Sequence, residues 1–137
     1  MTLESIGFVL VLQGNFVEGE PWVEQATAIA LEASARRYLA TNHMLMARCR
    51  RAQGRLAESR VLIEEASEVA KEASAGFLGP AIYAALAGSS KDPAERKRYL
   101  EQGQEMMSQY CMAPSRLLFY QDAIEVSLED GEWDAAL

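Results

Sequence analysis

The stretch that decides the fold reads QGRLAESRVLIEEA at residues 53–66. Gln53 and Gly54 end one helix, and apolar residues at helical spacing begin a second helix that packs back on the first. A copy, QGNFVEGEPWVEQA, lies at residues 13–26 and repeats the glycine, a small residue five positions later and an alanine twelve positions later. Partial copies lie at residues 94–103 and 131–137. A period of about 35 to 45 residues, with two helices in each, indicates an α-solenoid.

This repeat predicts an all-α fold, a solenoid of antiparallel helix pairs with about seven helices in a right-handed superhelix. We expect one domain over residues 1–137, in units of about 1–37, 38–75, 76–111 and 112–137. The fourth unit is incomplete, so we expect a fragment of a longer protein, or a partner helix from another chain. The helices are expected at about residues 2–13, 16–37, 37–53, 56–74, 80–87, 93–110 and 115–129.

Prolines and small residues refine these helices. Pro21 fits only a first turn, so the second helix begins at Phe16 or at Pro21, and Pro80 begins the fifth. Asp92 is the expected N-cap before Pro93. Six small residues fall at matching places in successive copies, where close helix crossings require small side chains: Gly7, Gly19, Ala26, Ala47, Ser59 and Ala66.

Composition excludes several classes of function. Thirteen basic and 20 acidic residues give a formal net charge of −7, which argues against a general binder of nucleic acids or anionic membranes. No stretch reaches the roughly 18 apolar residues of a membrane span. Cys49 and Cys111 lie far apart in apolar helical context, which favours buried reduced thiols and a cytoplasmic location over a disulfide.

The sequence contains no recognisable catalytic or cofactor-binding motif. Neither glycine-containing segment, residues 76–79 or 88–91, has the Gly-Lys-Ser/Thr of a phosphate-binding loop. The one histidine, His43, has no second histidine and no acidic partner on its helix, so we expect it in the core or at a groove edge rather than at a metal. The many glutamates lie on solvent faces of amphipathic helices. We therefore expect no enzyme activity, no cofactor and no metal.

The paired glycine, aromatic or aliphatic residue and small residues resemble the tetratricopeptide repeat, in a variety of about 40 residues. The C-terminal half adds a more specific resemblance, carried by four segments in order: GFLGP at 76–80, KDPAER at 91–96, LFYQDAIEV at 118–126 and GEWDAA at 131–136. Together they resemble the C-terminal repeat region of bacterial signalling proteins that join a class III adenylate or guanylate cyclase domain, an ATPase module and tetratricopeptide repeats. That family tends to carry Ser-His-Asn where this chain has Ala113-Pro114-Ser115.

The resemblance implies a surface for binding a partner. In such solenoids the first helix of each pair lines the concave face. Carrying the repeat register across places the candidate partner-binding residues at Phe8, Val11, Leu45, Arg48, Arg51, Ile82, Leu86, Gln121, Asp122 and Glu125, with Leu12, Thr41 and Leu128 beside them. The same apolar residues, in a fragment, also fit packing against repeats outside this sequence.

A cluster of arginines at residues 36–60 has two interpretations. It is either a docking site for an acidic peptide or another copy, or a set of helix-end cations that complement the helix dipole. Only Tyr38 interrupts the cluster as an aromatic residue, so binding of nucleic acid is disfavoured.

The sequence thus predicts a protein-binding or intramolecular regulatory scaffold, with a protein or peptide as partner, or a second copy in a homodimer. Two alternatives remain open. One is the repeat region of an ATP-dependent transcriptional regulator. The other is a solenoid that binds a small effector in an enclosed pocket lined by Met44, Met46, Tyr83 and Tyr120.

Overall fold

The computed structural model describes residues 2–73, 75–109 and 112–136. Within these residues the chain forms seven helices of ten or more residues, one of four residues and no strand, which confirms the predicted all-α fold class. The helices fall into two compact units, unit 1 at Met1–Ala73 and unit 2 at Ser74–Leu137. The predicted reduced thiol at Cys111 and helix end at Tyr110 lie outside the described residues.

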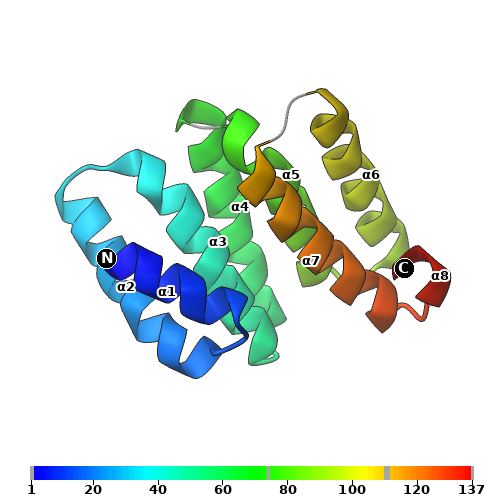
Figure 1. The fold of residues 1–137 in the computed structure, drawn as a ribbon, viewed down its shortest axis with the longest axis horizontal. Helices are drawn as coiled ribbons and strands as arrows, with labels where there is room; N and C mark the ends of the chain where they lie inside the picture. The colour runs from blue at the N-terminus through cyan, green and yellow to red at the C-terminus, as the bar shows by residue number, and fades with distance from the viewer. Residues whose placement is uncertain (1, 74, 110–111, 137) are drawn as a thin grey trace. The chain divides into compact units, whose positions relative to one another are not determined.

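Unit 1 contains four helices that pack in chain order (Figure 1). They are α1 (Leu3–Leu12), α2 (Phe16–Glu32), α3 (Arg36–Ala52) and α4 (Leu56–Ala73). α2 contacts both α1 and α3, and the most extensive contact of the unit joins α3 to α4. Its core cluster contains Val11, Val23, Leu45, Met46 and Cys49, so three of the four helices contribute buried side chains to one centre. Phe8, Phe16 and Leu62 pack against this cluster, and Leu62 brings in α4.

Three turns of unit 1 share one hydrogen-bond pattern. After α1, the amide of Gly14 donates to the carbonyl of Val11, and the amide of Asn15 donates to that of Leu10. The same two bonds recur 20 residues later around Ser34 and 40 residues later around Gly54. This pattern is the Schellman motif, which requires a positive φ at its central residue. Gly14 and Gly54 adopt φ values of +80° and +74° at little steric cost, because glycine has no side chain to clash.

Ser34 is the exception among these turns. Its φ is +52°, and it is the one non-glycine residue with positive φ in the described chain. This turn also corrects the sequence prediction, because α2 ends at Glu32 rather than near residue 37. The sequence offered no glycine at this place to mark the end. A side chain in the left-handed region costs roughly 1 kcal/mol, which the packing of α2 and α3 must offset.

Small residues let α1 and α2 cross closely. A Cβ on Gly7 would come within 2.7 Å of Val23 on α2, and one on Gly19 would come within 2.9 Å of Val11 on α1. In the second helix pair Ala47, Ser59 and Ala66 are all buried. These positions are therefore buried or in close contact, as predicted for small residues at helix crossings.

Two prolines lie deeper in their helices than the sequence predicts. Pro21 is the sixth residue of α2, and Pro80 is the sixth residue of α5 (Ala75–Ser89). A proline there removes one amide donor and crowds the carbonyl four residues earlier. For Pro21 that carbonyl belongs to Val17, whose side chain is exposed, so water can bond the carbonyl instead. The fifth helix thus starts five residues before its predicted start.

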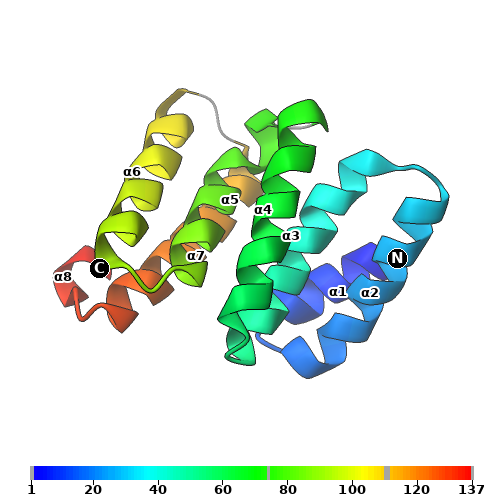
Figure 2. The ribbon, with the colours of Figure 1, turned by 180° about the vertical axis from the view of Figure 1, so that it is seen from behind.

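Unit 2 is built around α5. This helix packs on both α6 (Pro93–Gln109) and α7 (Ala113–Glu129), whereas α6 and α7 make few direct contacts with each other. Figure 2 shows α5 lying beside α6. The described side chains of α5 are small or aliphatic and almost all buried, with Tyr83 the partial exception. A four-residue helix, α8 (Trp133–Ala136), follows α7 after a turn at Gly131.

The ends of α6 and α7 follow the predicted signals. Oδ1 of Asp92 accepts a hydrogen bond from the amide of Ala94 at 3.0 Å, so Asp92 caps α6 as predicted, with Pro93 as the first helical residue. α7 starts at Ala113, two residues earlier than expected, because Pro114 fits its first turn. Among the described residues, none of the helices has the length and apolar character needed to cross a membrane.

Candidate protein-docking surface

The predicted concave-face residues of unit 1 are divided between core and surface. Val11 and Leu45 belong to the core cluster, and Arg48 is buried on α3. Phe8 packs against the core while remaining half-buried, and Arg51 is half-buried near the end of α3. The side chains of Val11 and Leu45 therefore hold the helices together, and Phe8 and Arg51 are the accessible members of this set.

The predicted residues of unit 2 divide in the same way. Ile82 and Leu86 are buried on α5, and Asp122 is buried on the inner side of α7. Gln121 is half-buried and Glu125 is exposed, both on α7. The accessible residues of the predicted set in this unit thus lie on a single helix.

Several arginines of unit 1 form ion pairs within that unit. Arg36 pairs with Glu72 at 2.8 Å, and Arg60 pairs with Glu64 at 2.5 Å. Arg50 lies against Glu20, Glu24 and Glu58 with little exposure of its side chain, and it thereby joins α3 to α2 and α4. Arg50 therefore serves the fold, whereas Arg36 stays exposed beside Glu72 and remains open to a partner.

Arg55 illustrates the same local pairing in the turn after α3. Its guanidinium donates to Glu58 at 2.7 Å, one helical turn further along. This hydrogen bond holds the pKa of the Glu58 carboxyl below its usual value. Glu58 is exposed, so the contact adds little to stability.

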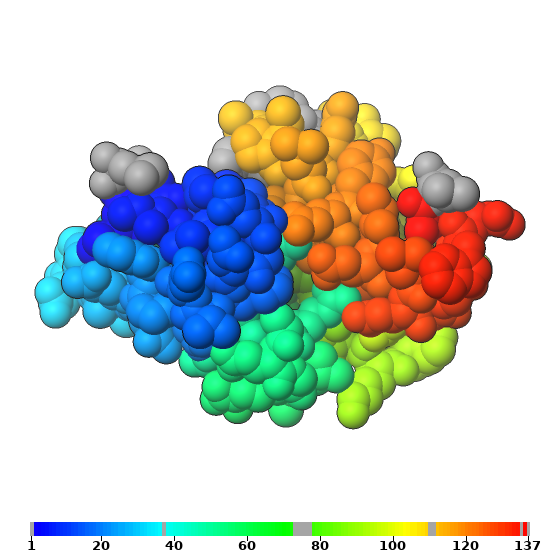
Figure 3. Space-filling view, turned by 60° about the horizontal axis from the view of Figure 1, so that its bottom comes forward, coloured from blue at the N-terminus to red at the C-terminus, as the bar shows by residue number. Residues whose placement is uncertain are grey.

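α7 carries an exposed apolar stripe on the side away from its core contacts. Leu117, Tyr120, Ile124 and Leu128 follow one another at spacings of three or four residues, so they share one face of the helix. Their exposed fractions are 72%, 48%, 42% and 41%. The opposite face buries Leu118, Phe119 and Val126. α7, orange in the space-filling view, lies open to solvent over much of its length (Figure 3).

Polar residues border this stripe, which we call the α7 stripe. Gln121 and Glu125 follow it along one side by helical geometry, and Arg116 lies on the other side near the start of the helix. Unit 2 as a whole is acidic: it holds five of the basic and ten of the acidic residues, and so −5 of the net charge of −7. The stripe therefore belongs to an acidic unit, with Glu125 as the carboxylate beside it.

Exposed apolar residues of unit 1 follow no such pattern. On α2, Val17, Trp22, Ile29 and Leu31 are exposed, but they fall on two faces of the helix, Trp22 with Ile29 and Val17 with Leu31. Single exposed apolar residues are ordinary on protein surfaces, whereas contiguous patches mark interaction sites. The α7 stripe is therefore the better candidate for a docking surface.

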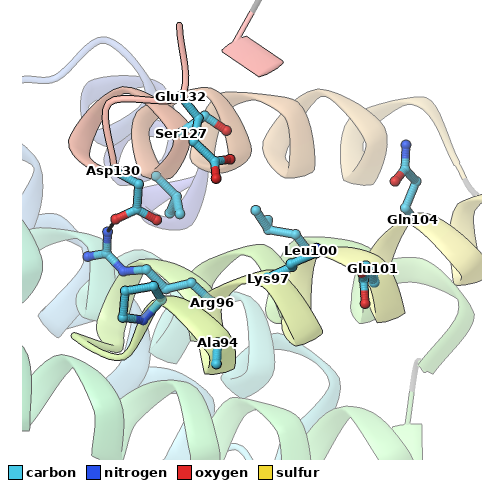
Figure 4. Close-up of a pocket in the computed structure, with 11 residues that line it drawn as sticks. Ala94, Arg96, Lys97, Leu100, Glu101, Gln104, Ser127, Asp130 and Glu132 are labelled. Atoms are coloured by element: carbon cyan, nitrogen blue, oxygen red, sulfur yellow. Dashed lines mark hydrogen bonds and ion pairs between the residues drawn. The ribbon is translucent and has the colours of Figure 1, made fainter. Parts of the chain in front are cut away.

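A cleft of about 570 Å³ lies between α6 and the end of α7 (Figure 4). Arg96 closes one end: its guanidinium binds Asp130 at 2.6 Å and Glu129 at 2.9 Å, and its Nε donates to the carbonyl of Ser90 at 2.8 Å. Leu100 and Val126 contribute apolar surface, while the remaining lining is mostly polar. These ion pairs join the start of α6 to the C-terminal end of α7.

Gly103 on α6 lets the N-terminal half of α7 pack closely against that helix. A Cβ there would come within 2.5 Å of the ring of Phe119, so the ring lies directly against the backbone of α6. Phe119 also contacts Tyr120 edge to face, with centroids 5.6 Å apart. One turn of α7 thus links the buried face to the exposed stripe through two adjacent aromatic rings.

Among the described residues, Cys49 and His43 do not form a reactive site. Burial raises the pKa of the Cys49 thiol to about 11, so it is protonated at neutral pH and unreactive, as expected for a buried thiol. Nδ1 of His43 lies 3.7 Å from Oε2 of Glu65 on α4, and its side chain is mostly buried. The described residues contain no cluster of three histidine, cysteine or acidic side chains that could hold a metal.

The effector pocket considered from the sequence involves side chains in different environments. Met44 and Met46 are buried in unit 1, and Tyr120 is 48% exposed on the α7 stripe. Tyr120 therefore does not line an enclosed pocket. Of the stripe, sequence reasoning named Leu128 and Tyr120 but missed Leu117 and Ile124. Their three- and four-residue spacing was the available signal, and it was obscured because α7 has apolar residues on both faces.

Comparison with known families identifies the N-terminal half of the chain. Residues 1–73 match the family described as tetratricopeptide repeat, which is all of unit 1 and just over half of the chain. Neither the curated proteins nor the solved structures yield a match.

Proposed function

This chain belongs to the tetratricopeptide repeat family, and we propose that it is a non-catalytic docking module that binds a protein partner through the α7 stripe. Stacked helical repeats generally present surfaces to other proteins. The observation that carries the proposal is the stripe itself: four large apolar side chains in register on one face of a helix whose other face is anchored in the core.

The chemistry of the stripe indicates the kind of partner. Anchors at three- and four-residue spacing fit the apolar face of an amphipathic helix. Gln121 and Glu125 beside the stripe, on a unit of net charge −5, favour basic residues along the edge of that helix. Of the partner-binding residues predicted from the sequence, Gln121 and Glu125 keep that role at the rim, and Phe8 and Arg51 are left outside this surface.

The partner in this proposal is a helix of a larger signalling assembly. The segments at 76–80, 91–96, 118–126 and 131–136 support a regulatory repeat region of a bacterial cyclase and ATPase protein, working in the cytoplasm. The stripe would then bind another domain of the same protein or a protein that regulates it. The open reading frame around this sequence tests the context: a class III cyclase domain and an ATPase module upstream are the expected result.

A peptide titration tests the docking surface directly. The probe is a fluorescein-labelled 18-residue helical peptide with leucines at three- and four-residue spacing and lysines along one edge of that face. The variant L117D/I124D places two carboxylates in the middle of the stripe. We expect at least a tenfold loss of affinity by fluorescence anisotropy, which corresponds to about 1.4 kcal/mol.

Two controls make this result specific. The variant V17D/V61D changes two exposed apolar residues of unit 1 in the same manner and should keep affinity within about twofold. A peptide with glutamates in place of the lysines should bind the parent chain more weakly. Equal losses in both double variants would show that the stripe is not the docking surface. A concentration-dependent dimer that L117D/I124D abolishes would assign the stripe to a second copy of the chain instead.

A further inference from the structure

The α7 stripe has counterparts in unit 1, because three helix pairs of this chain are joined by the same turn. Each turn holds a glycine with positive φ, which is Gly14, Gly54 or Gly131. The amide of the glycine donates to the carbonyl three residues earlier, and the next amide donates to the carbonyl five residues earlier. The second helix of each pair, α2, α4 or α8, begins two residues after the glycine. Counting back from these glycines therefore gives α1, α3 and α7 a common register.

In this register, two residues of the α7 stripe fall where α1 is covered by α2. Leu128 is the third residue before its glycine, as Val11 is on α1, and a Cβ on the facing glycine of α2 would come within 2.9 Å of Val11. Ile124 is the seventh residue before its glycine, as Gly7 is on α1. A Cβ on Gly7 would come within 2.7 Å of Val23 on α2. The second helix of the pair therefore lies directly against both positions in unit 1.

The other two residues of the stripe have counterparts on α3. Tyr120 is the eleventh residue before its glycine, as His43 is on α3, and Nδ1 of His43 lies 3.7 Å from Oε2 of Glu65 on α4. Leu117 is the fourteenth residue before its glycine, as Ala40 is, and Ala40 is fully buried. Each position of the stripe thus has a covered counterpart in unit 1, whereas on α7 it is exposed.

α8 begins the covering helix on α7 but spans only four residues, Trp133–Ala136. Four helical residues extend about 6 Å, which is roughly one turn. The corresponding helices α2 and α4 have 17 and 18 residues. The part of α7 from Leu117 to Ile124 therefore offers another helix the place that α4 has on α3.

The sizes of facing side chains indicate what that helix carries. Between α1 and α2, the small Gly7 faces the large Val23, and the large Val11 faces the small Gly19. Ile124 is a large residue at the position that Gly7 has on α1. A helix that packs at the usual axis separation of roughly 8–10 Å then needs a small residue opposite Ile124.

We propose that the partner helix takes on α7 the place that α4 takes on α3. This inference rests on the proposed function and adds an orientation and a register to it. Ion pairs join the start of α3 to the end of α4, and the end of α3 to the start of α4, so α4 is antiparallel to α3. The partner helix accordingly lies antiparallel to α7, with its N-terminal end toward α8 and its C-terminal end toward Leu117. It presents a glycine, alanine or serine to Ile124 and larger apolar residues to Tyr120 and Leu117.

Two peptide probes of equal composition test this arrangement. Both are 18-residue helical peptides with lysines along both edges and leucines at three- and four-residue spacing, and one leucine is replaced by alanine. The alanine lies in the N-terminal half of the apolar face in the first peptide and in the C-terminal half in the second. Only the first peptide places its alanine opposite Ile124 when it lies antiparallel to α7. Anisotropy titration of the fluorescein-labelled peptides should therefore show about tenfold tighter binding of the first.

A nitroxide spin label at the C-terminus of the first peptide reports the orientation directly. The label should broaden the backbone amide signal of Leu117 more than that of Leu128 in the ¹⁵N-labelled 137-residue chain. Stronger broadening at Leu128 would contradict the antiparallel arrangement.

A matched pair of variants tests the register. Ile124→Ala, at an exposed position, makes room for a leucine and should bring the affinity ratio of the two peptides to about one. Val17→Ala, at an exposed position of α2, should leave the ratio near ten. A ratio that stays near ten in Ile124→Ala would show that Ile124 does not face the small residue.

The failure of this inference is distinguishable from the failure of the proposed function. Equal binding of both peptides, still lost in L117D/I124D, would overturn the orientation and register but keep the α7 stripe as the docking surface. Binding that L117D/I124D leaves unchanged, or no binding of either peptide, would overturn the proposed function and this inference together.

Discussion

The helices of the two units pack in different orders. In unit 1 three helices end in the same Schellman turn at 20-residue intervals, and each helix packs on the next one in the chain. In unit 2 the first helix, α5, is the one that packs on both α6 and α7. The same pair of hydrogen bonds also ends α7 at Gly131, so the two units differ in the order in which their helices pack. Unit 1 is the half that matches the tetratricopeptide repeat family. The α7 stripe lies in unit 2, where the helices do not pack in chain order.

This contrast has a physical reason. α3 and α5 each pack on neighbours on two sides, and most of their described side chains are buried. α7 packs mainly on α5 and touches α6 only lightly, so its outer face remains accessible. The regular unit is therefore expected to supply stability, and the irregular unit to supply the contact surface.

The largest expected effect comes from a charge in the helix crossing of unit 1. Ala66 is fully buried on α4, so Ala66→Glu should destabilise the chain by about 3–5 kcal/mol, the cost of an unpaired buried charge. Ala57→Glu on the exposed face of the same helix should stay within about 0.5 kcal/mol. Urea unfolding measures both, and equal stabilities for the two variants would refute the assigned helix register.

Alkaline pH should weaken unit 1 through Cys49. The folded pKa of about 11 lies above the ordinary value of 9.0, because burial disfavours the thiolate. The unfolded thiol therefore loses its proton first, and the free energy of unfolding falls as the pH rises from about 9 through 11. Two pKa units correspond to an upper value of roughly 2.7 kcal/mol.

The reporter for this loss is the fluorescence of Trp22 in unit 1, measured during denaturant unfolding in a Trp133→Phe background. Cys49→Ala, in the same background, removes the titrating thiol and should have a shallower dependence on pH in this window. Identical slopes with and without the thiol would mean that Cys49 is not held as a buried neutral group.

The turn glycines should matter more in unit 1 than in unit 2. Gly54→Val places a β-branched residue at a φ of +74° between α3 and α4, and should cost about 1–3 kcal/mol. Gly131→Val introduces the same strain at a φ of +75°, but α8 has only four residues and can separate from α7. We expect a smaller loss there by thermal unfolding. A larger loss for Gly131→Val would reverse the assignment of unit 1 as the stabilising unit.

The smallest effect is a gain at the irregular turn of unit 1. Ser34→Gly relieves the positive φ of a non-glycine residue, and should raise stability by at most about 0.5 kcal/mol after the entropy of the unfolded glycine is subtracted. The melting temperature would rise by a few degrees. Ala28→Gly at an ordinary exposed helical position is the matched control and should lower stability.

Local signals in the sequence predicted most of the helix ends. Gly14 and Gly54 favour a positive φ because they have no side chain, and Asp92 favours an N-cap because its carboxylate accepts a hydrogen bond. α1 and α3 end, and α6 begins, where these residues predict. Ser34 lacks such a signal, so the end of α2 was placed five residues too late. Pro80 misled in the opposite sense, because α5 begins five residues before it and the packing of a long helix tolerates one missing hydrogen bond. α2 begins at Phe16, one of the two starts predicted.

The candidate surface was harder to predict than the fold. The repeat register correctly places residues on a helix, but whether Leu45 or Leu117 is covered depends on neighbouring helices that are distant in sequence. The α7 stripe therefore depends on tertiary packing rather than on local pattern.

Photo-crosslinking in the cell tests the central claim, docking through α7, most directly. A photoreactive amino acid replaces Leu117 on the α7 stripe in one protein and Val17 on α2 in another, and both positions are highly exposed. The account predicts a discrete adduct with a second polypeptide, or with another domain of the same protein, from position 117 and none from position 17. Adducts of equal yield from both positions, or an adduct from position 17 alone, would contradict it.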